Sequence, residues 1–352
     1  MKSTKKSPIL FFLCIFLLLI AWVVVQNLIQ QRRNLLLVPQ NKGMAHLQTV
    51  NGSLIAVFQD GQTCLWDWSN LNRPFRQFKM PSDRAVILAD KRVGTVTKTG
   101  KKLFVLYNLI DGNKFREIRV GSVDEDVQAA ISPNRKIILV ARKIPTAIDR
   151  FFNYEFMTLD LEEELLSPPV GISITESTES IVDFTITDDR QVLSAGMTTD
   201  KGRLLLLDMN SGRVFWNRTY DNTKEFCSVA IIPDHSTAYA GSRDGCLYKV
   251  DLTNGDLIAK IPLLREGETR EVTNDISVLN LSTDSKGQYV AATITPVSYI
   301  IDTRSDTLYH RWSTAHKLSS KIAFSPDNKY VATSDIRAGW PIDIWELEKL
   351  KK

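Results

Sequence analysis

The chain begins with a long apolar run and continues as a regular alternation of short apolar stretches and turns. Residues 9–25 contain no charged side chain, and Leu28 and Ile29 extend the apolar character. A helix over residues 9–29 rises about 30 Å, which matches the hydrocarbon core of a bilayer. The sequence therefore predicts one transmembrane helix over residues 9–29, preceded by a basic tail over residues 1–8.

A cleaved signal peptide is the alternative interpretation of this segment. Cleavage requires small residues one and three positions before the cut, and residues 23–27, Val-Val-Val-Gln-Asn, supply none. The missing cleavage site favours an uncleaved anchor. The three lysines of the N-terminal tail, partly balanced by Arg32 and Arg33, favour a cytoplasmic N-terminus. We therefore expect a single-pass membrane protein whose main body is periplasmic or otherwise exoplasmic.

Beyond residue 34, short apolar runs repeatedly end in an acid or amide followed by a turn. Seven such endings are spaced 41 to 52 residues apart. They are Cys64–Asp67, Val105–Asn108, Met157–Asp160, Leu205–Asp208, Tyr248–Asp251, Tyr299–Asp302 and Asp343–Glu346. Turns such as Asp111-Gly112 and Asn254-Gly255 suit hairpins because Gly and Asp tolerate positive φ. A period slightly above about 40–45 residues is typical of a four-stranded propeller blade.

These repeats resemble those of WD-repeat propellers and, equally, those of quinoprotein-like propellers. Trp66-Asp67 is the Trp-Asp dipeptide of the WD repeat, and Ala315-His316 stands where that family usually has Gly-His. Leu207–Trp216 is similar to the end of a quinoprotein blade. The resemblance implies an all-β fold, a seven-bladed β-propeller over residues 35–348 that follows the transmembrane helix.

The last repeat has three predicted strands before the chain ends. Residues 35–38, Leu-Leu-Leu-Val, form an unassigned apolar run after a short juxtamembrane linker at residues 30–34. We expect this run to supply the missing fourth strand, because closing the ring removes an exposed sheet edge. Residues 349–352 are expected to form a C-terminal tail.

Composition and charge exclude several classes of protein. The residues are 43% hydrophobic and 24% charged, which is too apolar for a disordered chain. Four scattered cysteines exclude a disulfide scaffold. The net charge is +4, but the first 33 residues carry +5 and leave −1 for the rest. Nucleic-acid binding needs clustered Lys and Arg, so we expect no nucleic-acid partner.

Candidate catalytic residues of a propeller are expected next to its central axis, on the innermost strands. Alignment of the innermost predicted strands places five residues at equivalent positions: Ala130, Asp183, Ala230, Asn280 and Ala323. Asp183 and Asn280 are therefore predicted to line the channel. Carboxylate catalysis normally uses a pair of acids, and Asp183 has no second member in this alignment. Since the four histidines also lack metal-ligand spacing, we predict no catalytic residue, metal or cofactor.

Two loops on one face are candidates for binding a protein partner. The first is an apparent insertion at residues 142–152, which carries Arg142, Lys143, Arg150, Phe151 and Phe152. The second carries Arg337 and Trp340. Trp and Arg are enriched in interface hot spots, and loops carry function more often than the scaffold does. The structural alternative is that these aromatic rings pack within their own blades.

The sequence therefore favours a non-catalytic interaction scaffold held at a lipid bilayer by its N-terminal helix, with protein partners. Two alternatives from other classes stay open. One is a degenerate quinoprotein-like oxidoreductase, and the other is a propeller that binds a glycan or another ligand.

Overall fold

The computed structural model describes most of the chain from Arg33 onward. The described residues are 33–36, 44–50, 53–58, 61–71, 74, 76–80, 85–88, 92–97, 101–123, 125–146, 152–163, 165–173, 180–198, 201–233, 236–264, 277–278, 280–294, 297–313, 321–325, 327–334 and 342–350. The helix predicted over residues 9–29 lies outside them and stays a prediction. Within the described ranges, no helix has the length and apolar character needed to cross a membrane.

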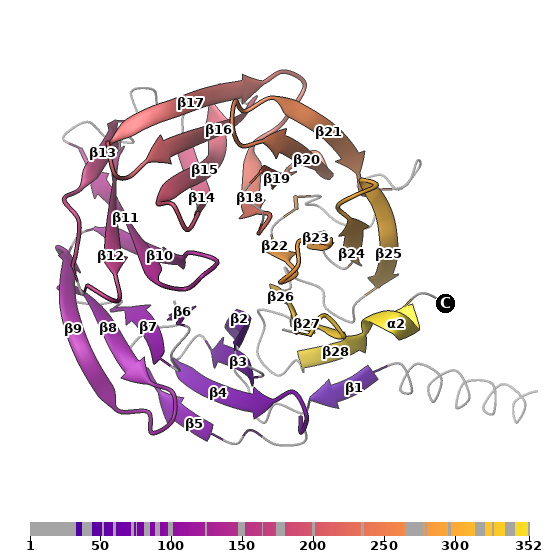
Figure 1. Ribbon diagram of the computed structural model, residues 1–352, viewed down its shortest axis with the longest axis horizontal. Helices are drawn as coiled ribbons and strands as arrows, with labels where there is room; N and C mark the ends of the chain where they lie inside the picture. Colours follow the sequence, from indigo (N-terminus) through magenta and orange to yellow (C-terminus); the bar gives the residue numbers. More distant parts are fainter. Residues whose placement is uncertain are drawn as a thin grey trace, which may run out of the picture.

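Seven four-stranded antiparallel sheets form a ring around one axis (Figure 1). Blade 1 consists of β2 (Met44–Val50), β3 (Ser53–Phe58), β4 (Gln62–Asp67) and β5 (Arg76–Lys79). Blade 2 consists of β6 (Ala85–Ile87), β7 (Arg92–Val96), β8 (Lys102–Asn108) and β9 (Lys114–Gly121). Blade 3 consists of β10 (Asp126–Ile131), β11 (Ile137–Pro145), β12 (Phe152–Asp160) and β13 (Val170–Ser173). Blade 4 consists of β14 (Ser180–Ile186), β15 (Gln191–Thr198), β16 (Lys201–Asp208) and β17 (Arg213–Tyr220).

Blade 5 consists of β18 (Phe226–Ile231), β19 (Thr237–Ser242), β20 (Cys246–Asp251) and β21 (Leu257–Pro262). Blade 6 consists of β22 (Asn280–Thr283), β23 (Tyr289–Ile294), β24 (Val297–Asp302) and β25 (Thr307–Ser313). Blade 7 combines β26 (Lys321–Phe324), β27 (Tyr330–Ser334) and β28 (Ile342–Glu346) with β1 (Arg33–Leu36) from the other end of the chain. The predicted all-β, seven-bladed architecture is confirmed.

Each blade has two edges with different connections. The first strand of a blade lies next to the axis and the fourth lies outermost (Figure 1). Because neighbouring strands are antiparallel, the turns from first to second strand and from third to fourth strand share one edge of the ring, which we call the turn edge. The turns from second to third strand and the connections between blades share the opposite edge, which we call the loop edge.

The side chain that ends most third strands caps the turn into the fourth strand. Asp251 Oδ1 accepts a hydrogen bond from the backbone N–H of Thr253 at 2.7 Å, and Asp67, Asn108, Asp160, Asp208 and Asp302 do the same two residues ahead of themselves. Such side-chain turns favour Asp and Asn over other residues. The recurring ending in the sequence is therefore the turn cap of each blade.

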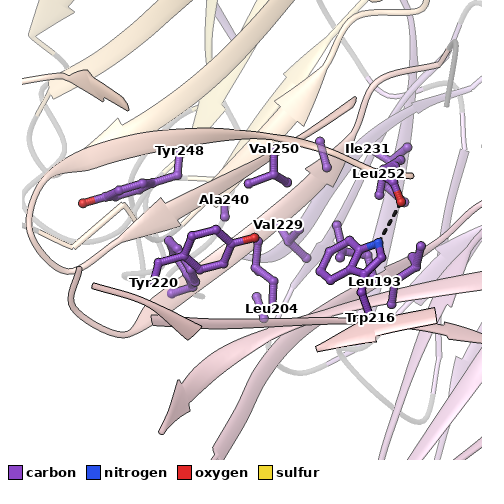
Figure 2. Packing of buried hydrophobic residues seen from close by; sticks show 14 of the residues in the cluster. Leu193, Leu204, Trp216, Tyr220, Val229, Ile231, Ala240, Tyr248, Val250 and Leu252 are labelled. Carbon is purple, nitrogen blue, oxygen red and sulfur yellow. Dashed lines mark hydrogen bonds between the residues drawn. The ribbon is translucent and has the colours of Figure 1, made fainter. Parts of the chain in front are cut away.

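Apolar side chains fill the space between neighbouring blades. Between blades 4 and 5, Trp216 and Tyr220 of β17 pack with Leu204, Tyr248 and Val250 in one buried cluster (Figure 2). The Trp216 indole N–H donates to the backbone carbonyl of Leu252 at 2.8 Å (Figure 2). Middle strands such as β3 and β19 are buried along nearly their whole length, since sheets cover both of their faces.

The two ends of the chain meet in blade 7. β1 pairs antiparallel with β28, with Arg33 opposite Trp345 and Leu36 opposite Ile342. The closing strand thus begins two residues earlier than expected, inside the predicted linker, and residues 37–38 lie outside the described residues. The expected C-terminal tail is partly helical instead: α2 (Leu347–Leu350) buries Leu347 and Leu350 in the apolar cluster between blades 6 and 7.

Candidate functional site

The axial positions inferred from the sequence are only partly equivalent. Ala130 pairs with Leu139, Ala230 with Tyr239 and Ala323 with Ala332, each one residue pair from the end of its ladder at the turn edge. Asp183 pairs with Ala195 and Asn280 with Thr293, two residues farther from that edge. The predicted alignment was therefore wrong for Asp183 and Asn280, by the two residues of one strand repeat. By ladder position, Lys321 of β26 is the blade 7 equivalent of Asp183 and Asn280.

Asp183, Asn280 and Lys321 belong to an arc of polar contacts around the axis. Asp183 Oδ2 of blade 4 accepts a hydrogen bond from the backbone N–H of Val229 in blade 5 at 2.9 Å. Lys321 Nζ of blade 7 donates to Asn280 Oδ1 of blade 6 at 2.9 Å. All three residues are partly buried. These two hydrogen bonds link the inner strands of blades 4 and 5 and those of blades 6 and 7.

The two charged groups of this arc have shifted pKa values. Burial raises the pKa of Asp183 to about 6, against the lowering effects of the N–H groups of Val229 and Phe184 and of the charge on Lys321. Burial lowers the pKa of Lys321, and the charge on Asp183 opposes that shift. A carboxyl group that titrates near neutral pH is chemically able to exchange a proton there.

The raised pKa of Asp183 predicts a pH-dependent contribution to stability. Its stabilising effect is complete below the ordinary pKa of 3.8 and is lost as the pH rises through about 6. D183N lacks the titrating group, so the unfolding free energy of the natural chain relative to D183N should fall by up to about 3 kcal/mol between about pH 4 and pH 8. Chemical unfolding of both chains across this range measures the difference. A difference independent of pH would contradict the assigned burial of the carboxyl group.

The turn edge of the axis is bridged by an arginine. Arg135, in the turn between β10 and β11, donates from Nη2 to the backbone carbonyl of Thr49 at 2.7 Å. This contact runs from blade 3 to blade 1, past blade 2. Thr49 in turn donates from its hydroxyl to the carbonyl of Phe324 in blade 7. Arg135 therefore ties the first and third blades together where the inner strands turn.

The described residues of the insertion predicted at residues 142–152, namely 142–146 and 152, extend the hairpin of β11 and β12. Arg142 and Lys143 belong to β11, where they pair with Glu155 and Tyr154 of β12. The Arg142 guanidinium contacts the carboxylate of Glu155 and lies 3.5 Å from that of Glu125. Lys143 Nζ lies 5.9 Å from the centre of the Tyr154 ring. Both cations are thus engaged within their blade.

A small groove opens beside this hairpin, between blades 3 and 4 toward the loop edge. It has a volume of about 80 Å³ and its lining includes Asp126, Gln128, Arg142, Lys143, Tyr154 and Val182. Pockets for small molecules typically measure about 300–1,000 Å³. The groove is therefore too small for a metabolite but has room for one side chain.

The structure describes one of the other predicted docking residues. Phe152 is the first residue of β12 and pairs with Pro145 at the loop edge. Arg150, Phe151, Arg337 and Trp340 lie outside the described residues. The prediction that these residues contact a partner stays a prediction.

Metal-ligating and thiol groups are dispersed in the described part of the chain. It contains no group of three or more His, Cys, Asp or Glu side chains arranged to hold a metal ion. Cys64, Cys227 and Cys246 are buried, and none of them forms a disulfide. Burial raises the pKa of Cys246 to about 11 and also raises that of Cys227, so both thiols stay protonated at neutral pH.

The comparisons with known proteins concern the fold. No family model matches the chain, and no curated protein matches it. Among solved structures, it is similar to the β-propeller domain of Cps50 (Swd1) from Myceliophteria thermophila, with 16% sequence identity, a TM-score of 0.65, and coverage of 89% of this chain and 99% of that chain. The chain is a seven-bladed β-propeller. At this identity the similarity shows the fold alone, and the choice between WD-repeat and quinoprotein-like relatives stays a prediction.

Proposed function

We propose that this propeller is a non-catalytic interaction scaffold, held at a membrane by residues 9–29, that binds a protein partner at its loop edge. The observation that carries the proposal is the groove between blades 3 and 4. It combines the exposed Val182 with charged groups of both signs, Asp126 and Lys143. An apolar contact flanked by opposite charges suits a protein segment, which presents apolar and charged side chains side by side.

The hairpin next to the groove supports the same function. β11 and β12 continue for two residue pairs, Ile144–Asn153 and Pro145–Phe152, beyond the point where the inner strand β10 begins. The hairpin therefore projects past its own inner strand at the loop edge. Since Arg142 is held by Glu125 and Glu155, the base of the hairpin is a fixed wall for a partner to contact.

Site-specific photocrosslinking in native membranes tests the proposal. A benzophenone side chain at position 182 should crosslink one defined protein, and K143E, W340A or F152A should reduce its yield about tenfold, as expected for loss of a hot-spot contact. Val123 provides the control, because it is also an exposed valine toward the loop edge but lies outside the groove. Equal yields from positions 123 and 182, or no effect of any of the three substitutions, would contradict the docking site.

The axial arc favours a second candidate function, that of an enzyme or a ligand binder. A carboxyl group with a pKa of about 6 is a feature shared by many catalytic sites. Analysis of the purified protein distinguishes the two functions. Stoichiometric Ca²⁺ together with a quinone absorbance would support the oxidoreductase alternative, and a bound oligosaccharide would support the glycan-binding one.

A further inference from the structure

Exposed hydrophobic residues gather on one edge of the ring. Among the described residues, the large hydrophobic side chains that are at least 42% exposed include eight in the turn before a fourth strand or in the first three residues of that strand. These turn-edge residues are Ile110, Phe115, Leu165, Val214, Phe215, Leu257, Ile258 and Leu308. The other two exposed residues, Val123 and Val182, lie toward the loop edge. Exposed apolar residues scattered without a function would not favour one edge.

The start of the outer strand carries exposed apolar residues at a β-bulge. In β17 the bulge leaves Phe215 as an extra residue between Val214 and Trp216, and both Val214 and Phe215 are exposed. Leu257 and Ile258 repeat this arrangement at the bulge of β21. Blades 2 to 6 each contribute at least one turn-edge residue, and the fourth strands follow the outside of the ring (Figure 1). Contacts spread along the rim of one edge match a flat partner surface.

The chain also enters the ring at the turn edge. Arg33 pairs with Trp345, next to the turn-edge end of β28, whereas Leu36 pairs with Ile342 at the other end. The predicted transmembrane segment ends at Ile29, four positions before Arg33. Four extended residue steps span at most about 14 Å. A bilayer that holds this segment therefore lies within that distance of the turn edge at blade 7.

These two independent observations identify the surface and its occupant. We propose that the turn edge of the propeller lies against the bilayer, with the eight turn-edge residues at the boundary between headgroups and acyl chains. Arg213 directly precedes Val214 and is exposed, so it is placed to contact lipid phosphates. The loop edge, with the groove beside the β11–β12 hairpin, faces away from the membrane. The inference rests on the membrane anchor of the proposed function.

Fluorescence quenching by lipid nitroxides tests this orientation in the full chain. A bimane probe is attached to V214C or, as the matched control, to V123C, both in a C14S background. The remaining cysteines are buried, which limits their labelling. Each protein is reconstituted in vesicles of phosphatidylcholine and phosphatidylglycerol, with or without a nitroxide lipid labelled near the headgroup. Insertion to headgroup depth predicts at least about twofold stronger quenching at position 214 than at position 123.

Extraction with alkaline carbonate separates failure of the orientation from failure of the anchor. Retention of the chain in the vesicles, with quenching confined to V214C, supports the proposal. Retention with equal or no quenching at the two positions overturns the orientation and leaves the anchored scaffold intact. A disulfide-linked dimer of the unlabelled V214C protein, together with no quenching of the bimane-labelled protein, assigns the turn edge to a second copy. This result also overturns the proposal. Release of the chain by carbonate overturns the anchor and, with it, the orientation.

Discussion

Replacing Trp66 by alanine is expected to lower the free energy of unfolding by about 4 kcal/mol, the usual cost of removing a large buried aromatic side chain. Trp66 is fully buried in a cluster that joins blade 1 to blade 7 through Ala332, Ile342 and Ile344. Neighbouring backbone in β27 and β28 cannot move into the space, because it is fixed in the blade 7 ladder. Urea unfolding followed by far-ultraviolet circular dichroism measures the loss.

The W66F variant is the matched control for this substitution. The Trp66 indole N–H has no hydrogen-bond partner among the described residues, so phenylalanine removes a buried donor without breaking a bond. We expect W66F to cost less than about 1.5 kcal/mol. Equal losses for W66A and W66F would show that the indole N–H, rather than the ring volume, stabilises this junction.

Replacement of Arg33–Leu36 by Gly-Ser-Gly-Ser is expected to destabilise the ring by at least about 3 kcal/mol, from the lost ladder hydrogen bonds and the lower strand preference of glycine. The ladder with β28 spans four residue pairs. Its loss exposes the edge of β28, which is an aggregation hazard. Thermal unfolding and size-exclusion chromatography of the full chain in detergent should show a lower midpoint and larger particles.

The same replacement in β5 is the control, because β5 is also an outermost strand of four residues that pairs with four residues of its neighbour. It belongs to blade 1, which is built from one continuous segment of the chain, so losing it does not separate the two ends of the ring. We expect a smaller loss and no aggregation. If the two replacements cost the same, the closing strand would have no role beyond its own hydrogen bonds.

The repeat carried most of the information about the fold. Each recurring Asp or Asn satisfies a local requirement of the turn that follows, as Asp251 does for Thr253, so the positions of the third strands could be predicted from the sequence. The closing strand could be predicted to within two residues because a blade with three strands requires a fourth. The seventh ending differs, because Glu346 is followed by α2 in place of a turn and a fourth strand. The Glu346 carboxylate lies 2.6 Å from Lys349 Nζ, and no property of the repeat indicates that helix.

The axial arc could not be predicted to the same extent. The sequence places Asp183 and Asn280 on inner strands, but the alignment follows alanines near the turn and does not reveal Lys321, which donates to Asn280. Counting back from the turn in every repeat would have found it. The ion pairs of Arg142 depend on Glu125 and Glu155 from other strands. Such contacts are set by strand register, which the pattern of one strand does not reveal.

The composition of blade 7 constrains how the protein is made. Among the described strands, its outermost strand β1 leaves the ribosome first, and β28, with which β1 pairs, leaves last. During synthesis β1 has no native partner until translation is nearly finished. A chain truncated before Ile342 therefore carries an open ring, which gives proteases and chaperones a direct mark of incomplete translation.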